Sequence, residues 1–267
     1  MQLLLDTEII CELTMKNNSF NKDFYNILKC LSVNHEGIEY FQKDESLLLT
    51  LKEYFPTLKP TSNRPDSYSI VGDKILLLEH FQFDNSRIIK KGSKQNLIFA
   101  DTDRKLDKSL SNQNLVVLNE YVEKCGKYYV DNFIKQFTSH ATKIDDYKKA
   151  IQLETKQTFS SCLVGFIIED ASLFGSFYFD NTIKCVNLLH TKEFLDCFEK
   201  TTNLDFVIFA MTGNENNKIL SFISKQTINE HRKNQIEVSR IKNFCFQNSF
   251  CASTILYIPK KIKKLIN

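Results

Sequence analysis

The chain has 267 residues and a formal net charge of +3, from 35 basic and 32 acidic side chains. This balance does not by itself indicate a nucleic-acid-binding protein, and the low content of glycine (7) and proline (4) favours a folded α/β protein over a disordered one. The eight cysteines include no Cys-x-x-Cys pair, which argues against a zinc ribbon or a thioredoxin-like site. The first residues show no charged region followed by an apolar core and a cleavage site, so we do not expect secretion, and no apolar run approaches the roughly 18 residues of a membrane span. We therefore expect a cytoplasmic protein with reduced cysteines and no membrane partner.

The first predicted elements are two helices. Between residues 20 and 55, apolar side chains recur at helical spacing, and a second helix is predicted from Asp44 to Tyr54, closed by Pro56. The stretch from Pro56 to Pro65 carries three prolines, so an extended connection is expected there.

The segment at 64–81 (RPDSYSIVGDKILLLEHF) predicts a β-hairpin with Gly72 and Asp73 as its two-residue turn. Counting outward from this turn gives the register, in which Val71 pairs with Lys74, Tyr68 with Leu77, and Asp66 with Glu79. Directly opposed residues share a face of the sheet, with Cβ atoms about 5 Å apart.

Two carboxylates this close destabilise a sheet unless a cation lies between them or one of them takes up a proton. Glu79 also interrupts an apolar strand, where loss of solvation costs several kcal/mol unless a partner compensates. The pair therefore indicates a divalent metal site. In the alternative interpretation, Glu79 is the first exposed residue of a strand that leaves the sheet, since Asp84, Asn85 and Ser86 resemble a strand exit.

The rest of the chain predicts alternating helices and strands. Long helices are expected from Asp101 to about Phe159, with apolar residues such as Tyr129, Phe133 and Phe137 on one face. Further on, the pattern predicts strands at 162–168, 173–179 and 205–211, helices at 191–200 and 215–235, and a strand or hairpin at 244–258. This order is typical of a mixed β-sheet flanked by helices. We expect a single α/β domain over 1–267, with a helical insertion at about 101–159.

The run Arg64-Pro65-Asp66, followed by a strand, a turn and a second strand ending in Glu79-His80-Phe81, resembles the PD-(D/E)xK nuclease superfamily. The resemblance implies a restriction-endonuclease-like fold in which Asp66 and Glu79 bind Mg²⁺ or Mn²⁺. It implies hydrolysis of DNA phosphodiester bonds, in a bacterial defence or mobile-element setting. In that family a lysine two positions after the acid helps to activate water.

Phe81 stands at the lysine position, so another residue must supply the cation. Arg64, which the register places on the same face as Asp66, is one candidate, and Lys90 or Lys91 is another. Lys90, Lys91 and Lys94 are also candidates for binding nucleic-acid phosphates, although each lysine cluster also fits a plain solvated face. Phe81 favours a second interpretation, in which a degraded nuclease fold serves as a binding or regulatory module. The sequence leaves open RNA as a substrate, a homodimer and a partner protein.

Other candidate sites are weaker. His80 is expected on the face opposite Glu79, as a buried, hydrogen-bonded histidine. Glu169-Asp170 follows a predicted strand and is expected to cap the next turn rather than to join the metal. The helix acids that could approach a metal are Glu36, Glu39, Glu45 and Glu53. The chain has no Gly-x-Ser-x-Gly elbow, no Walker lysine motif and no Gly-x-Gly-x-x-Gly run, which argues against serine hydrolase, ATPase, kinase and dehydrogenase functions.

Overall fold

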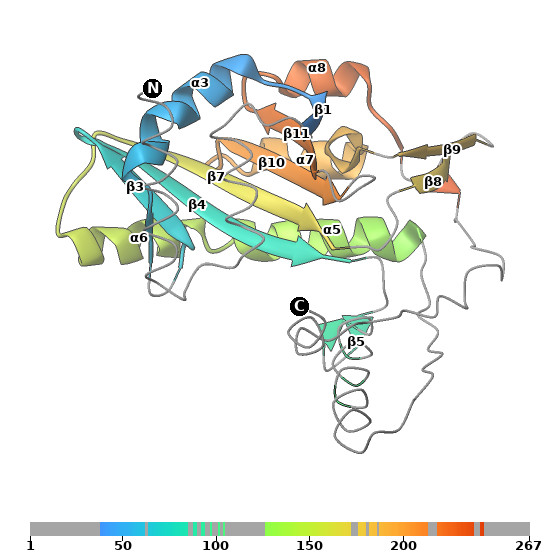
Figure 1. The fold of residues 1–267 in the computed structure, drawn as a ribbon, viewed down its shortest axis with the longest axis horizontal. Coiled ribbons are helices and arrows are strands. Elements are labelled where there is room, and N and C mark those ends of the chain that lie inside the picture. The colour runs from blue at the N-terminus through green and yellow to red at the C-terminus, as the bar shows by residue number, and fades with distance from the viewer. Residues whose placement is uncertain are drawn as a thin grey trace, which may run out of the picture.

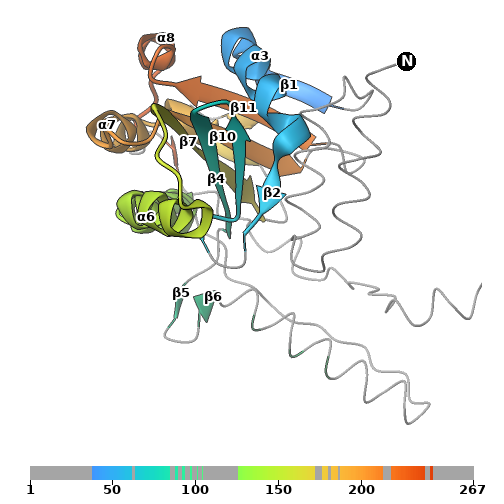
Figure 2. The same cartoon turned by 90° about the vertical axis from the view of Figure 1, so that its left-hand side faces the viewer.

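A mixed seven-stranded β-sheet, in the order β1-β11-β10-β7-β4-β3-β2, forms the centre of the structure. The computed structural model describes residues 38–61, 64–84, 88–89, 92–93, 97, 101, 104, 126–171, 176–179, 182–185, 187–212, 218–237 and 241–242. Figure 1 shows α3 above the sheet and α5 and α6 below it, and Figure 2 shows α6 and α7 together on one side. The predicted mixed α/β class is confirmed.

The elements of the large sheet are β1 (Ile38–Gln42), β2 (Lys59–Pro60), β3 (Ser67–Val71), β4 (Lys74–Phe83), β7 (Ser161–Asp170), β10 (Phe206–Thr212) and β11 (Lys218–Ser224). A three-stranded sheet contains β8 (Ser176–Phe179), β9 (Thr182–Cys185) and β12 (Ile241–Lys242), and a small ribbon contains β5 (Ile88–Ile89) and β6 (Gly92–Ser93). The helices are α3 (Glu45–Tyr54), η1 (Phe55–Thr57), α5 (Gly126–Ala141), α6 (Ile144–Thr155), η2 (Leu188–His190), α7 (Lys192–Lys200) and α8 (Ile228–Lys233).

The β3–β4 hairpin has the predicted register. Val71 pairs with Lys74, Tyr68 with Leu77, and the ladder ends with the pair Ser67 and Leu78. Gly72 has a φ of +62°, and Asp73 does not share this left-handed conformation. A positive φ at the first turn residue alone is typical of a type II′ turn, for which glycine is preferred. The turn therefore fixes which residues of the two strands face each other.

Strands β4, β7 and β10 are parallel neighbours and are buried on both faces. Their side chains alternate between two apolar clusters, one under α5, α6 and α7 and the other under α3 and η1. The predicted apolar face of α5 is confirmed, because Tyr129, Phe133 and Phe137 are fully buried in the first cluster. Helices α5 and α6 connect β4 to β7 along the chain.

Other sequence predictions have mixed outcomes. The helix expected at 44–54 is confirmed as α3. Asp44 caps the N-terminus of this helix, because its side chain accepts a hydrogen bond from the backbone N–H of Leu47. The helix expected at 215–235 is wrong, because Lys218–Ser224 forms β11 and, among the described residues of this range, only the six of α8 are helical. Every residue of β11 pairs with β10, so sheet formation prevails over a helical pattern. The predictions at 20–37, 105–125 and 244–258 lie outside the described residues.

Among the described helices, none has both the length and the hydropathy needed to cross a bilayer. Cys162 and Cys197 are free thiols and half-buried, and burial raises the pKa of both.

Gly165 of β7 leaves room for an aromatic ring. A Cβ atom at this position would lie 2.0 Å from Cζ of Phe206, the β10 residue that pairs with Gly165. The Phe206 ring is fully buried, so it cannot swing into solvent. We predict that Gly165→Ala lowers the free energy of unfolding by about 1–3 kcal/mol in urea denaturation. In a Phe206→Leu background the same substitution should cost much less, and an equal loss in both backgrounds would contradict the steric explanation.

A pair of buried histidines lies beside the β1–β11 edge of the sheet. The rings of His190 (η2) and His231 (α8) meet edge to face with centroids 5.0 Å apart, and His190 Nε2 lies 2.7 Å from Oε1 of Gln42. Burial lowers the pKa of each histidine to about 4. The nearby His231 lowers the pKa of His190 further, whereas backbone groups of Phe222 and Leu189 partly oppose the lowering at His231.

This pair should make the protein sensitive to acid. Above pH 6.5 both rings are neutral in the folded and unfolded states. As the pH falls from 6.5 towards 4 the unfolded chain binds protons first, so stability falls. We predict a loss on the order of 2 kcal/mol between pH 7 and pH 5, allowing for solvent screening. His190→Gln keeps a donor for Gln42 without titrating, so its loss should be smaller. Equal losses in the two proteins would rule out His190 as a contributor.

Candidate active site

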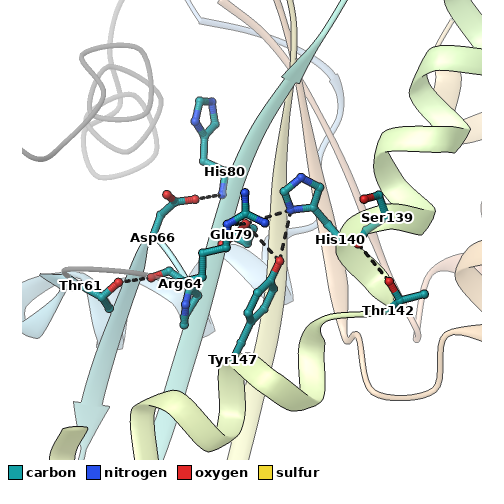
Figure 3. A network of polar contacts seen from close by, with 10 residues as sticks. Thr61, Arg64, Asp66, Glu79, His80, Ser139, His140, Thr142 and Tyr147 are labelled. Carbon is teal, nitrogen blue, oxygen red and sulfur yellow. Dashed lines mark hydrogen bonds and ion pairs between the residues drawn. The ribbon is translucent and has the colours of Figure 1, made fainter. Parts of the chain in front are cut away.

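Asp66 and Glu79 come together at the open end of the β3–β4 hairpin (Figure 3). Asp66 immediately precedes β3, and the register that pairs Ser67 with Leu78 leads to Asp66 opposite Glu79. The Asp66 carboxylate accepts a hydrogen bond from the backbone N–H of His80 at 2.6 Å. It thus takes the place of a backbone carbonyl where the ladder between the two strands ends.

Glu79 is buried, with a relative exposure of 2 %. Its Oε1 atom lies 2.9 Å from Nδ1 of His140, accepts a hydrogen bond from the Tyr147 hydroxyl at 3.1 Å, and lies 3.7 Å from Nε of Arg64. Its Oε2 atom is buried and has no hydrogen-bond partner within the described part of the chain. The interpretation of Glu79 as the first exposed residue of an emerging strand is therefore wrong. A buried carboxylate oxygen without a partner is costly and points to a missing ligand.

The electrostatics of Asp66 reflect the same crowding. Burial, followed by the nearby Glu79 carboxylate, raises the pKa of Asp66 to about 6, while the His80 backbone N–H and Arg64 oppose the shift. Burial and Glu79 also raise the pKa of Tyr147, so its hydroxyl stays protonated and donates to Glu79.

Phe81 cannot replace the lysine of the PD-(D/E)xK pattern, and the structure shows what it does instead. Its ring stacks on the imidazole of His140, with centroids 4.1 Å apart and planes 10° from parallel. Phe81 therefore holds in place a side chain that contacts Glu79. His140 comes from the last turn of α5 and Tyr147 from α6, which makes the α5–α6 turn one wall of the site.

Arg64 is the predicted cation that the structure brings to the site. Its side chain is 49 % exposed, and its guanidinium approaches the same Oε1 atom that His140 and Tyr147 contact. The other predicted cations, Lys90, Lys91 and Lys94, lie outside the described residues.

His80 and Glu169 form a second polar contact. His80 Nε2 lies 3.3 Å from Oε2 of Glu169, which also accepts a hydrogen bond from Gln82 at 2.7 Å. The prediction of a buried, hydrogen-bonded His80 directed away from Glu79 is confirmed (Figure 3). Glu169 and Asp170, which were predicted to cap the next turn, are buried at the end of β7, and Asp170 accepts a hydrogen bond from the Tyr129 hydroxyl. Residues 172–175, where that turn would follow, lie outside the described structure.

Of the four acids named as possible further ligands, Glu45 and Glu53 do not join the site. Glu45 pairs with Lys43 at 2.6 Å, and Glu53 is exposed on α3. Glu36 and the side chain of Glu39 lie outside the described part of the structure.

The donor set fits a hard divalent cation only in part. Carboxylate oxygens are suitable ligands for Mg²⁺, which is commonly bound by one or two carboxylates together with waters and substrate phosphates. Asp66 and the free Oε2 of Glu79 would provide these two carboxylates. Within the described ranges, no group of three or more histidine, cysteine, aspartate or glutamate side chains has metal-binding geometry. A cation here would therefore depend on water or phosphate for most of its coordination.

Sequence reasoning missed His140 and Tyr147. They lie 61 and 68 residues from Glu79 in the chain, and no local pattern connects them to the hairpin. No protein-family model matches the chain, and comparisons with curated proteins and with solved structures also gave no match. The function must therefore be argued from the geometry of the site.

The raised pKa of Asp66 leads to a stability prediction. Below pH 3.8 Asp66 is protonated in both the folded and the unfolded protein. Between pH 3.8 and 6 the unfolded chain loses this proton first, so the free energy of unfolding decreases, and the full decrease is reached above pH 6. We predict that Asp66→Asn raises the free energy of unfolding at pH 8, without divalent metal, by on the order of 2 kcal/mol. The gain should disappear near pH 4. Asp73→Asn, at the exposed turn of the same hairpin, is the matched control, and destabilisation of Asp66→Asn at pH 8 would contradict the prediction.

Proposed function

We propose that the protein is a metal-dependent nuclease with a restriction-endonuclease-like fold, which hydrolyses DNA phosphodiester bonds in a bacterial defence or mobile-element setting. Three features support this proposal: the Pro-Asp and Glu residues of the PD-(D/E)xK pattern, the mixed sheet with helices on both faces, and the convergence of Asp66 with Glu79. The setting rests on the resemblance alone.

The single observation that carries the proposal is the Glu79 Oε2 atom. It is buried, it has no partner among the residues that the structure describes, and it belongs to a carboxylate that raises the pKa of a second carboxylate beside it. A purely structural glutamate would have both oxygens satisfied, since a buried oxygen without a hydrogen bond costs about 1–3 kcal/mol. A divalent cation would satisfy Oε2 and remove the repulsion from Asp66 together.

The residues would divide the work as follows. Asp66 and Glu79 would hold Mg²⁺ or Mn²⁺, an ion that in such sites activates water and stabilises charge on phosphate. Arg64 is half exposed and already within reach of Glu79, so its guanidinium can bind a phosphate oxygen of the substrate. Lys90, Lys91 and Lys94 follow β4 in the sequence and would contact the DNA backbone, with Lys91 or Lys90 as a further source of positive charge at the site.

A second candidate function is favoured by Phe81. An aromatic ring stands where the family has its lysine, and Arg64, His140 and Tyr147 already surround one oxygen of Glu79. These contacts suit a degraded nuclease fold that acts as a binding or regulatory module, alone, as a homodimer or with a partner protein. RNA is the alternative nucleic acid for either function.

A cleavage assay tests the proposal. The full chain, incubated with supercoiled plasmid and either Mg²⁺ or Mn²⁺, should nick the DNA, and EDTA should abolish the activity. Asp66→Asn and Glu79→Gln should each reduce the rate by about 100-fold or more, because each removes several kcal/mol of charge stabilisation. Calorimetric titration with Mn²⁺ should show binding that both variants weaken.

Asp73→Asn is the matched control, since it removes an exposed carboxylate from the same hairpin without touching the site. A protein that binds no Mn²⁺ and cuts neither plasmid DNA nor single-stranded RNA would overturn the nuclease proposal in favour of the binding module. Cleavage of RNA alone would correct the substrate.

A further inference from the structure

The hydrogen bonds of His140 fix its tautomer. Its Nδ1 atom lies 2.9 Å from Oε1 of Glu79, and an ionised carboxylate only accepts hydrogen bonds. Nδ1 must therefore carry a hydrogen and donate it to Glu79. The Tyr147 hydroxyl, 3.3 Å from Nδ1, donates its own hydrogen to the same Glu79 oxygen. In a neutral imidazole, Nε2 is then left with a lone pair.

Nε2 is open to a ligand. Among the described residues no hydrogen-bond partner contacts it, and the His140 side chain keeps a relative exposure of 10 %. Figure 3 shows the second ring nitrogen directed away from Glu79 and Tyr147. One edge of the imidazole is thus held by the protein, and the other presents a hydrogen-bond acceptor at the edge of the site.

Phe81 controls the plane of this ring. The near-parallel stacking at 4.1 Å prevents the imidazole from tilting, and the Phe166 ring packs against its edge with centroids 6.3 Å apart. The side chain at position 81 therefore contacts the face of the His140 ring directly. A lysine at this position would extend into the space that the imidazole occupies.

We propose that His140 takes the role that the resemblance assigns to a lysine at position 81: its Nε2 accepts a hydrogen bond from the attacking water and orients it towards the phosphate. This inference rests on the proposed nuclease function. The other neighbours of Glu79 cannot accept a hydrogen bond from that water, because a guanidinium has only donors and the Tyr147 hydroxyl is committed to Glu79. Arg64 would instead supply the positive charge that a lysine carries. The arrangement also leaves Oε2 of Glu79 for the cation, since His140 uses only Oε1.

Paired substitutions separate this role from a structural one. The amide of His140→Asn can still donate to Glu79 from near the Nδ1 position, but nothing replaces Nε2. We expect kcat for plasmid nicking to fall about 100-fold, as for a misplaced nucleophile, with KM and the Kd for Mn²⁺ within threefold of wild type. His140→Gln, whose amide reaches the Nε2 position, should retain more activity than His140→Asn.

A rescue tests the link to position 81. In a His140→Ala background, Phe81→Lys should recover at least tenfold of the lost kcat, because the lysine can enter the vacated space. Phe81→Met in the same background fills that space without a nitrogen and should recover nothing.

Failure of the proposed role of His140 can be distinguished from failure of the proposed nuclease function. If wild type binds Mn²⁺ and cuts DNA but His140→Asn cuts within threefold of wild type, the role of His140 is overturned and the nuclease function stands. If His140→Asn weakens Mn²⁺ binding as strongly as Glu79→Gln does, His140 serves only to hold the carboxylate, and the inference is again overturned. If wild type neither binds Mn²⁺ nor cuts nucleic acid, the function and the inference fall together.

Discussion

The burial of the Glu79 carboxylate is the constraint on which the site depends. It places a charge inside a strand whose neighbouring residues, Leu76, Leu77 and Leu78, are almost completely buried. Such a charge is tolerated only with partners, and these come from two different helices, His140 from α5 and Tyr147 from α6. The turn between the helices is therefore fixed relative to β4 by polar contacts as well as by the apolar cluster beneath it. A single carboxylate oxygen thus connects the sheet to the helical layer.

Asp66 adds a second constraint that acts against stability. Its carboxylate ends the β3–β4 ladder by accepting the His80 N–H, a role that a neutral amide could fill without electrostatic cost. Burial and the neighbouring Glu79 instead leave it with a raised pKa, so the pair is held at the expense of folding free energy. Clustered groups with perturbed pKa values are found preferentially at functional sites, although structural networks also produce them. The unpartnered Oε2 atom of Glu79 is what separates the two cases here, because a structural network would satisfy both oxygens.

Local signals predicted the hairpin and failed where distant contacts decide. The two-residue turn at Gly72 and Asp73 determines the register by counting, and Asp44 with Pro56 bounds α3. The segment at 218–224 was predicted as helix, but its strand structure depends on pairing with β10, which a local pattern does not contain. For the same reason Asp66, Glu79 and Arg64 could be found from the sequence, whereas His140 and Tyr147 could not. Their role exists only because α5 packs against β4 and α6 shares an apolar cluster with it. A helical histidine without this fold context resembles any other.

Phe81 is better understood as part of the site than as a defect in it. Without a ring at position 81, the imidazole of His140 would lose the surface on which it stacks and could adopt several orientations. The phenyl ring provides that surface and fixes the plane of His140, whose Nδ1 then meets Oε1 of Glu79. Arg64 approaches the same Oε1 atom, so the internal positive charge and the helix contacts all gather on one oxygen. Because they do, the opposite oxygen of Glu79 stays available next to Asp66, and an external cation can be added without displacing any protein contact.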